Sequence, residues 1–463
     1  MKRSMMILLG MGLVLSGCTM IPKYERPAPP VPAAWPGPEA GPSAAPLAPD
    51  VGWREFFTDP RLQHVIETAL ANNRDLRVAA LNIEKAAALY RVQRSELYPG
   101  VGVLATGDKY RLPPKMTDDG NPQIVSQYSV QVGISAWELD LFGRIRSLKQ
   151  RALEQFFATQ QARSAAQISL VGAVAYSYLT LAADHENLRL TQSTLDAQSA
   201  YYDLIAQSRE LGVASDLELS QAQSQVEVAR LDAAKFRGLV EMDLNALNLL
   251  AGTSIPSDLL PEGLDAVVKP ADIRAGLPSE VLLRRPDILM AEHQLLAANA
   301  NIGAARAAFF PRISLTLGGG TMSSDVSGLF SSGTGTWTFA PQITAAIFAS
   351  GLQMANLKGA RVDREIAVAQ YEKAIQTAFR EVGDALTQRT SLAEQQEAAQ
   401  ALVGALEKTH RLANARYEAG VDGYLGVLVA QRSLYSAQQG LVGLRMAGLA
   451  NQVTLYKVLG GGQ

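Results

Sequence analysis

The stretch between residues 127 and 252 changes its hydrophobic period once and is helical from there on. In its first part apolar residues alternate with polar ones, and the apolar positions are Tyr128, Val130, Val132, Ile134 and Ala136. An alternation of period two indicates a strand with one apolar and one polar face. After Gly143 about 65 residues follow without proline, which would form a helix roughly 100 Å long. Because a globular core does not need such a length, we expect an element that spans a distance.

The second half of the chain repeats this order of elements about 208 residues later, as the spacing of Gly212 and Gly420 illustrates. Residues 75–99 match residues 287–311, and alternating strands follow both segments. The period is too long for a solenoid repeat of roughly 20 to 50 residues. Prolines are absent between Pro122 and Pro256, as expected for helix interiors, which reject proline at a cost of about 3 kcal/mol. We therefore predict a duplicated module that reads helix, strand, strand, long helix, turn, helix.

The predicted fold is mainly α-helical with a membrane β-barrel, and its boundaries follow from composition and period. We expect a signal peptide at 1–17, a strap rich in proline and alanine at 18–58, a first repeat at 59–252, a linker at 253–278 and a second repeat at 279–463. The expected strands lie at about 100–112, 125–139, 312–323 and 335–346, and the expected helical hairpins at about 143–252 and 350–459.

The first residues have the form of a secretory signal. A basic start is followed by a short apolar segment and by Leu15-Ser16-Gly17-Cys18. These four residues resemble the bacterial lipobox, which implies cleavage before Cys18 and acylation of that cysteine. The alternative is an ordinary signal peptide that contains a cysteine. Thr19, rather than aspartate, follows the cysteine, and by the same resemblance it favours the outer membrane.

Composition excludes several classes of protein. The net charge is −2 and no basic run occurs, so we expect no nucleic-acid partner. A single cysteine excludes an internal disulfide, and four scattered histidines suggest no metal site. The sequence lacks a Gly-x-Ser-x-Gly or His-Glu-x-x-His motif, and we expect that the protein is not an enzyme. Apart from a covalent lipid on Cys18 we expect no cofactor.

The alternating strands are too few to close a barrel within one chain. Four strands fall short of the practical minimum of about eight. Strands can cross lipid only in a closed sheet, because open edges leave backbone groups without hydrogen bonds. Several chains must therefore combine their strands, and the helices would extend the barrel as a conduit.

The sequence resembles the TolC-type outer-membrane factors, and in particular the OprM-like lipoprotein branch of tripartite drug-efflux channels. The resemblance covers nearly the whole mature chain. Its motifs lie at residues 15–18, 52–57, 72–77, 137–144, 284–288, 304–311 and 420–434. It implies a homotrimer with a twelve-stranded barrel in the outer membrane of a Gram-negative bacterium and a helical tunnel through the periplasm. It also implies docking to a periplasmic adaptor (membrane fusion protein) and to an inner-membrane pump, usually of the proton-driven RND type, and passive export of drugs and other small toxic compounds.

The same resemblance assigns roles to the turns between the long helices. It implies that Gly212, Val213, Gly420 and Val421 contact the adaptor, although the glycines alone would also serve as helix-reversal residues. A constriction of the family matches Leu425, whose counterpart in the first repeat is Leu217.

The acidic positions of the family's gate match Gly426 and Val429 in this chain. We therefore expect an apolar periplasmic gate at Leu425 and Val429, with Arg432 nearby. Any acidic ring must come from Asp216, Glu218 or Asp422, or be absent. Arg416 and Arg432 are either paired with carboxylates on neighbouring helices or solvated.

Other functions remain open at this stage. Within the class of exit ducts, the cargo could be metal ions or, in type I secretion, protein. A periplasmic adaptor lipoprotein would need a single helical hairpin flanked by β-rich segments, and a lipoprotein enzyme would need catalytic motifs.

Overall fold

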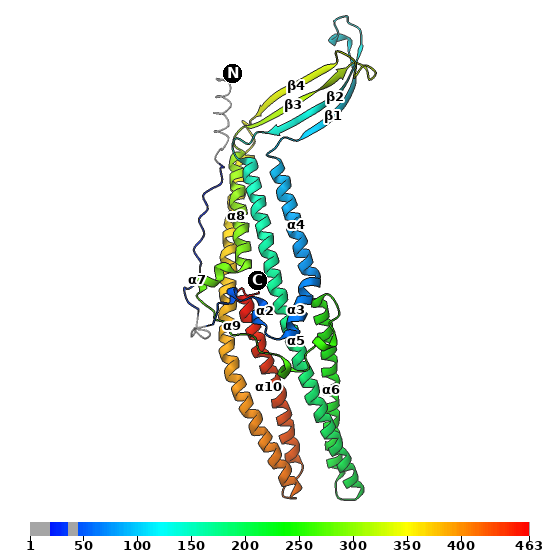
Figure 1. Cartoon of the computed structure of the whole chain (residues 1–463), viewed down its shortest axis with the longest axis vertical. Coiled ribbons are helices and arrows are strands. Elements are labelled where there is room, and N and C mark those ends of the chain that lie inside the picture. The colour runs from blue at the N-terminus through cyan, green and yellow to red at the C-terminus, as the bar shows by residue number, and fades with distance from the viewer. Residues whose placement is uncertain (1–18, 36–44, 463) are drawn as a thin grey trace. The chain divides into compact units, whose positions relative to one another are not determined.

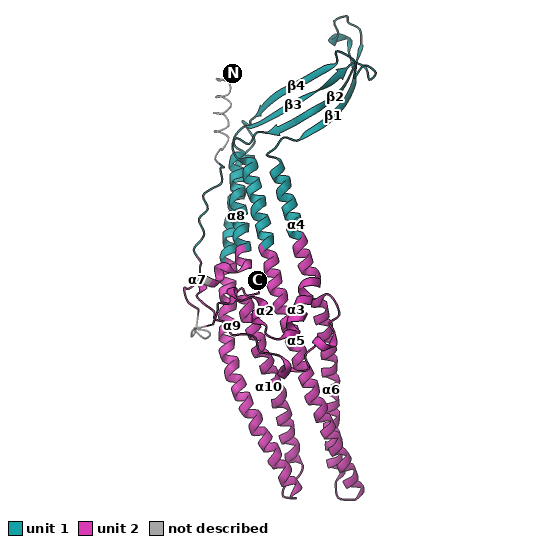
Figure 2. Cartoon of the chain, in the orientation of Figure 1, with its two compact units in different colours: residues 1–28, 82–160, 290–372 teal, residues 29–81, 161–289, 373–463 magenta. Residues whose placement is uncertain are grey.

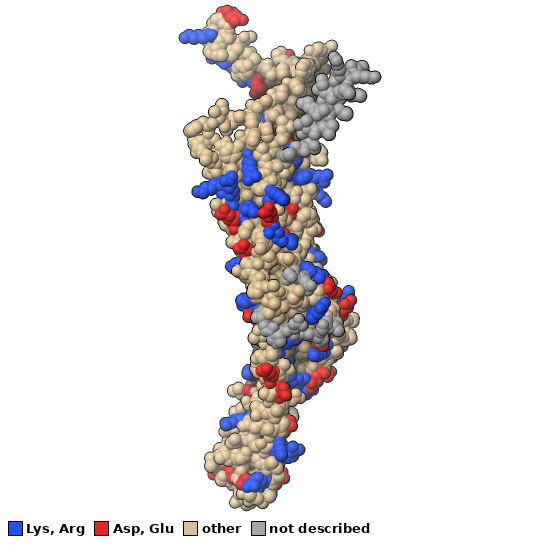
Figure 3. Space-filling view, turned by 90° about the vertical axis from the view of Figure 1, so that its left-hand side faces the viewer, with Lys and Arg blue, Asp and Glu red and all other residues tan. Residues whose placement is uncertain are grey.

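The computed structural model of the chain describes residues 19–35 and 45–462 (Figure 1). The predicted signal peptide and the predicted acylation site Cys18 lie outside the described residues. On the face shown in Figure 3, lysine, arginine, aspartate and glutamate are interspersed along the helical part of the chain.

Two compact units divide the chain, and each unit draws on both sequence repeats (Figure 2). The first unit comprises residues 1–28, 82–160 and 290–372, and the second comprises residues 29–81, 161–289 and 373–463. These units differ from the repeats predicted at 59–252 and 279–463. The reason is that each long helix contributes its beginning to one unit and its end to the other.

The first unit contains one four-stranded antiparallel sheet in the order β1-β2-β3-β4. The strands are β1 (Val101–Leu112), β2 (Gln123–Glu138), β3 (Arg312–Ser323) and β4 (Gly335–Thr344). The unit also contains the C-terminal parts of α4 (Arg74–Ser95) and α8 (Pro286–Ala307) and the first turns of α5 (Arg144–Glu210) and α9 (Leu352–Glu418). A bulge interrupts the pairing of β2 with β3 between Ile134 and Trp137.

The second unit contains the rest of these helices and the two helical reversals. α5 turns into α6 (Asp216–Ala251), and α9 turns into α10 (Leu425–Val458). The shorter helices of the unit are α2 (Trp53–Phe56), α3 (Pro60–Asn72) and α7 (Pro278–Val281). The 3₁₀ turns of the chain are η1 (Ala48–Asp50), η2 (Pro114–Met116), η3 (Ser257–Leu259), η4 (Leu264–Ala266) and η5 (Leu282–Arg284).

The core of the second unit packs aromatic residues from distant parts of the chain. Tyr456 of α10 stacks on Phe56 of α2, with ring centroids 3.9 Å apart, and its hydroxyl donates to the Val51 carbonyl at 2.6 Å. Phe57 lies edge-on to both rings. α5 contributes the fully buried Tyr178. One 18-residue window of α5 is apolar enough to span a membrane by composition, but 56% of it is buried within the structure, as in a core helix.

Candidate functional site

The sheet has one apolar and one polar face. Val101, Ile134, Leu317 and Phe339 are paired in register across the four strands and form one row. Residues paired across antiparallel strands project from the same side of a sheet. The neighbouring row on the opposite side consists of Gly102, Gly133, Gly318 and Thr338.

The apolar face and both edges of the sheet are uncovered in the single chain. On the apolar face Val103 is 71% exposed and Trp337 is 79% exposed. Among the described residues, β1 pairs only with β2, and β4 pairs only with β3. A strand edge with free backbone groups and an exposed apolar face are both features that further chains or lipid cover.

The strap after Cys18 lies along helix α8 within the first unit. The carbonyl groups of Met20 and Pro22 accept hydrogen bonds from Arg306 at 3.3 Å and from Asn299 at 2.9 Å. A Cβ atom at Gly303 would lie 2.8 Å from the backbone nitrogen of Ile21, so only glycine admits the strap at this point. The first described residues are thereby held at the C-terminal end of α8, a few residues before strand β3 begins.

A partly buried ion pair, in which Arg26 is half exposed and Glu292 is largely buried, holds the next part of the strap. Arg26 donates two hydrogen bonds to the carboxylate of Glu292, at 2.7 and 2.8 Å, and the Tyr24 hydroxyl donates a third at 3.0 Å. The hydrogen bond to Glu292 raises the pKa of Arg26 above its ordinary value, so the guanidinium stays charged. The sequence did not indicate this contact, because Glu292 looks like any polar residue of an amphipathic helix.

Both helical reversals use glycine in the left-handed conformation. Gly212 has φ of 77° and Gly420 has φ of 70°. In each turn the glycine N–H and the N–H of the following valine bond back to the preceding helix, at 2.9 Å in all four cases. This pair of bonds is the Schellman arrangement that ends helices. Val213 and Val421 are therefore presented at the turns, 82% and 61% exposed.

The acidic residues of the turns have partners within the chain. Arg209 donates a hydrogen bond to the carboxylate of Asp216 across the first turn, at 2.6 Å, and Arg416 donates one to Asp422 across the second turn, at 3.1 Å. Glu218 closes a capping box with Ser215 at the start of α6. The hydrogen bond with Arg416 lowers the pKa of Asp422. Arg416 thus forms an ion pair, but with Asp422 of its own turn and not with a carboxylate on a neighbouring helix.

The predicted gate residues lie on the exposed side of the first turns of α10. Leu425, Gly426, Val429 and Arg432 are all exposed, whereas Val427 and Leu428 are buried. Arg432 forms no ion pair among the residues that the structure describes. Helix α10 contains no aspartate or glutamate. Along α10 the exposed stripe is therefore apolar at Leu425 and Val429 and basic at Arg432. Leu217 is likewise exposed at the start of α6.

Three tyrosines pack together and connect the N-terminal end of α10 with helices α5 and α9. Tyr424, which precedes α10, stacks on Tyr201 of α5 with ring centroids 3.9 Å apart and planes 14° apart. Tyr417 of α9 lies 5.2 Å from Tyr424, and the Tyr201 and Tyr417 hydroxyl oxygens are 3.4 Å apart. The sequence did not indicate this tyrosine cluster, because the three residues come from two different repeats.

The chain thus combines a four-stranded sheet, whose apolar face is uncovered, with two long helical hairpins. A family model described as outer membrane efflux protein matches residues 65–253 and 277–461. The chain belongs to this family.

Individual relatives agree with this assignment. The chain is 50% identical to the toluene efflux pump outer membrane protein TtgC of Pseudomonas putida, over 100% of this chain and 96% of that protein. It is 42% identical to the outer membrane protein OprJ of Pseudomonas aeruginosa, over 97% and 94% of the two chains. The open-state MtrE outer membrane channel of Neisseria gonorrhoeae has a similar structure, with a TM-score of 0.87, 39% identity and coverage of 96% and 98%. The predicted family, function and location are confirmed: the protein is the outer-membrane exit duct of an efflux system in a Gram-negative bacterium.

Proposed function

We propose that three copies of this chain combine their sheets into one twelve-stranded barrel in the outer membrane. The observation that carries the proposal is the four-stranded sheet with two free edges, one apolar face and one polar face. Three such sheets supply more than the roughly eight strands that closure requires. The apolar face would then meet lipid, and the polar face would line the lumen, as in other membrane barrels.

Helix α4 supports an assembly of several copies. Leu76 is its one buried residue among those described, while Val78, Leu81, Leu89 and Val92 are exposed at helical spacing. A helix with an exposed apolar stripe packs that stripe against another surface. We infer that a neighbouring copy covers it and that the helices of three copies form a periplasmic tunnel.

Cys18, in this proposal, is acylated and anchors each copy in the outer membrane. The contacts of Met20 and Pro22 with α8 support this, since they hold the strap near the start of strand β3. An acyl chain contributes about 0.8 kcal/mol per buried CH₂, so several chains would anchor the strap firmly.

The turns at Gly212–Val213 and Gly420–Val421 are the proposed contacts for a periplasmic adaptor that links the duct to an inner-membrane pump of the RND type. Their exposed valines are preorganised by the Schellman turns and the arginine–aspartate pairs. The proposed gate is the ring of Leu425 and Val429 from three copies, which would close by excluding water from an apolar constriction.

The cargo that we propose is organic solvents and drugs, as the names of the relatives suggest for those proteins. Deletion of the gene should sensitise the bacterium to toluene and to several antibiotics and leave its tolerance of copper and zinc unchanged. Sensitivity to metals alone would contradict this cargo.

Cross-linking tests the barrel. We would place cysteine at Thr106 of β1 and at Thr338 of β4, both on the polar face, and treat intact cells with a bismaleimide. The double variant should give covalent dimers and trimers, and neither single variant should. If the double variant stays monomeric, the sheets do not close on one another.

Single-channel recording tests the gate. Val429→Asp would place three carboxylates in a constriction whose helix otherwise has none. The wild-type conductance should be insensitive to hexaamminecobalt(III) added on the periplasmic side, and the variant should be blocked. A wild-type channel that is blocked as strongly would show that an acidic ring exists elsewhere in the duct.

A further inference from the structure

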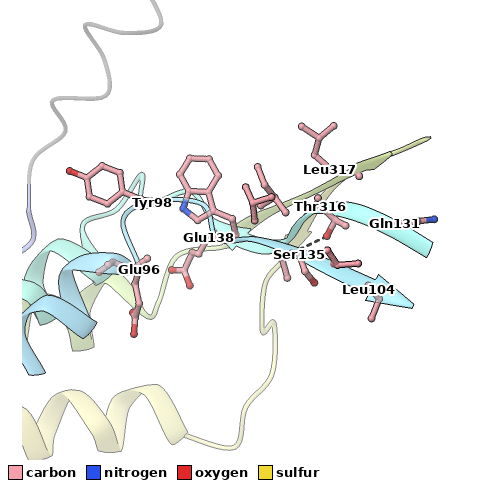
Figure 4. A pocket seen from close by; sticks show the side chains of 18 of the residues that line it. Glu96, Tyr98, Leu104, Gln131, Ser135, Glu138, Thr316 and Leu317 are labelled. Atoms are coloured by element: carbon pink, nitrogen blue, oxygen red, sulfur yellow. Dashed lines mark hydrogen bonds between the residues drawn. The ribbon is translucent and has the colours of Figure 1, made fainter. Parts of the chain in front are cut away.

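The base of the sheet contains a hollow of about 650 Å³ that the exit-duct function does not explain. Strands β1, β2 and β3 and the segments that join them to the helices line it (Figure 4). In Figure 4, Leu104, Ser135, Glu138 and Glu96 project from one side of the sheet, and Leu317 projects from the other. The volume lies in the range of roughly 300 to 1,000 Å³ typical of sites for small molecules.

Two features of the backbone create this hollow. The row Gly102, Gly133 and Gly318 runs across three strands and leaves the sheet without side chains there. The bulge in β2 takes Ser135 and Ala136 out of the pairing with β3, and Ala136 adopts φ of 48°. The Ala136 N–H donates to the Thr316 hydroxyl at 3.1 Å, which holds the bulge in place. Bulges are frequent beside functional sites, where they redirect side chains.

The lining has an excess of negative charge. Arg144 donates two hydrogen bonds to the carboxylate of Glu138, at 2.8 and 2.7 Å. These hydrogen bonds raise the pKa of Arg144, so its guanidinium stays charged. Glu96 receives one hydrogen bond from the neutral amide of Gln93, at 2.7 Å, and forms no ion pair among the described residues. A cation in the hollow would therefore meet one uncompensated carboxylate.

An aliphatic group completes the lining on this side of the sheet. Leu104 pairs with Gln131 and lies on the same face as the row Gly102, Gly133 and Gly318. Trp137 pairs with Leu315 of β3, so its ring projects from the other face together with Leu317 and does not line the hollow on this side. An occupant with a positive charge and an apolar body would meet Glu96 and Leu104 together.

We propose that this hollow is a binding station for amphiphilic organic cations on the lumenal side of the barrel. The proposal rests on the proposed function, because it is the barrel that turns the polar face toward the lumen. Cargo would dwell at the base of the barrel before it leaves the cell, so the duct would hold its cargo and not only conduct it.

The test measures binding of rhodamine 6G, an organic cation, to the purified full-length protein in lipid nanodiscs by fluorescence polarisation. Gly102→Leu fills the hollow, since a Cβ atom at this position meets no atom within 4 Å. Glu96→Gln removes the uncompensated charge from an exposed position. Gly335→Leu is the matched control, because its Cβ is equally free but the residue lies outside the hollow.

Rhodamine 6G should bind the wild type and the control equally and bind the Glu96→Gln variant at least about fivefold more weakly, the effect of one unit charge at contact distance in water. The Gly102→Leu variant, whose side chain occupies the hollow, should weaken binding at least as much. Anionic fluorescein should not bind. A conducting trimer that binds no rhodamine 6G, binds fluorescein as well, or is unaffected by both substitutions would overturn the site while the duct stands. A wild-type protein that forms neither trimers nor channels would overturn the proposed function, and the lumenal site with it.

Discussion

The tyrosine cluster makes a quantitative prediction for the end of helix α10. Tyr424→Ala removes a ring that is 4% exposed and that packs between Tyr201 and Tyr417. Truncation of a buried aromatic residue costs about 3 to 5 kcal/mol, of which about 0.5 to 1.5 kcal/mol reflects the ring pair itself. We expect about 3 kcal/mol here, since Tyr201 and Tyr417 are only half-buried.

This loss should appear as local opening of the helix end. About 3 kcal/mol corresponds to a roughly 100-fold increase in the open fraction of the first turns of α10. Hydrogen exchange of the amides at 425–433 and 198–205 should accelerate by this factor, while exchange in the core around Tyr178 stays unchanged. The same variant should show a higher closed-state leak in single-channel recordings.

A matched variant separates the ring from its hydroxyl. Tyr424→Phe keeps the stacked geometry and should accelerate exchange by less than about tenfold, the effect of roughly one hydrogen bond. If Tyr424→Ala exchanges like the wild type at 425–433, the cluster does not hold the helix end, and its stabilising role must be abandoned.

Three further predictions concern the strap, pH and the strands. Arg26→Ala leaves the largely buried Glu292 carboxylate without its charged partner. Because Arg26 itself is half exposed and screened by solvent, the strap should lose about 1 kcal/mol of binding to α8 and be cut faster in limited proteolysis, whereas loss of a fully exposed ion pair should have no such effect. Burial, together with the neighbouring carboxyl of Asp184, raises the pKa of Asp243 from 3.8 to about 6. The folded state therefore binds more protons between these values, and its stability falls as pH rises toward 6. Thermal unfolding at pH 5 and pH 7.5 should show this fall in the wild type and lack it in Asp243→Asn. Gly320→Ala would place Cβ 2.0 Å from a backbone oxygen of β2 and should abolish heat-resistant trimers on gels, whereas Gly319→Ala, with 3.9 Å to its nearest atom, should keep them.

Local sequence patterns predicted much of the fold, because the strands and helices have simple hydrophobic periods. The alternation predicted a strand at about 125–139, and the structure has β2 at Gln123–Glu138. Glycine in the turns was equally readable, since Gly212 and Gly420 need positive φ. The bulge at Ser135 and Ala136 was not readable, because it depends on the register with β3, which no local period encodes.

Side-chain pairing was beyond the reach of sequence reasoning. The acidic residues considered for a gate, Asp216 and Asp422, form hydrogen bonds with arginines. The geometry of the two turns brings these pairs together, and sequence spacing alone does not reveal them. The division into two compact units also crosses the sequence repeats, since packing follows the long helices and not the order of duplication.

The strap has a consequence for the order in which the molecule folds. Arg26 and Glu292 are 266 residues apart in the chain, so their contact closes a loop of more than half its length. Long-range contacts form late, because the entropy of loop closure must be overcome before the contact stabilises anything. The N-terminus leaves the translocation machinery first, yet its docking surface on α8 is exported only after the whole first repeat. The strap thus stays unattached until α8 has been exported, and its docking reports that this helix, near the start of the second repeat, has arrived.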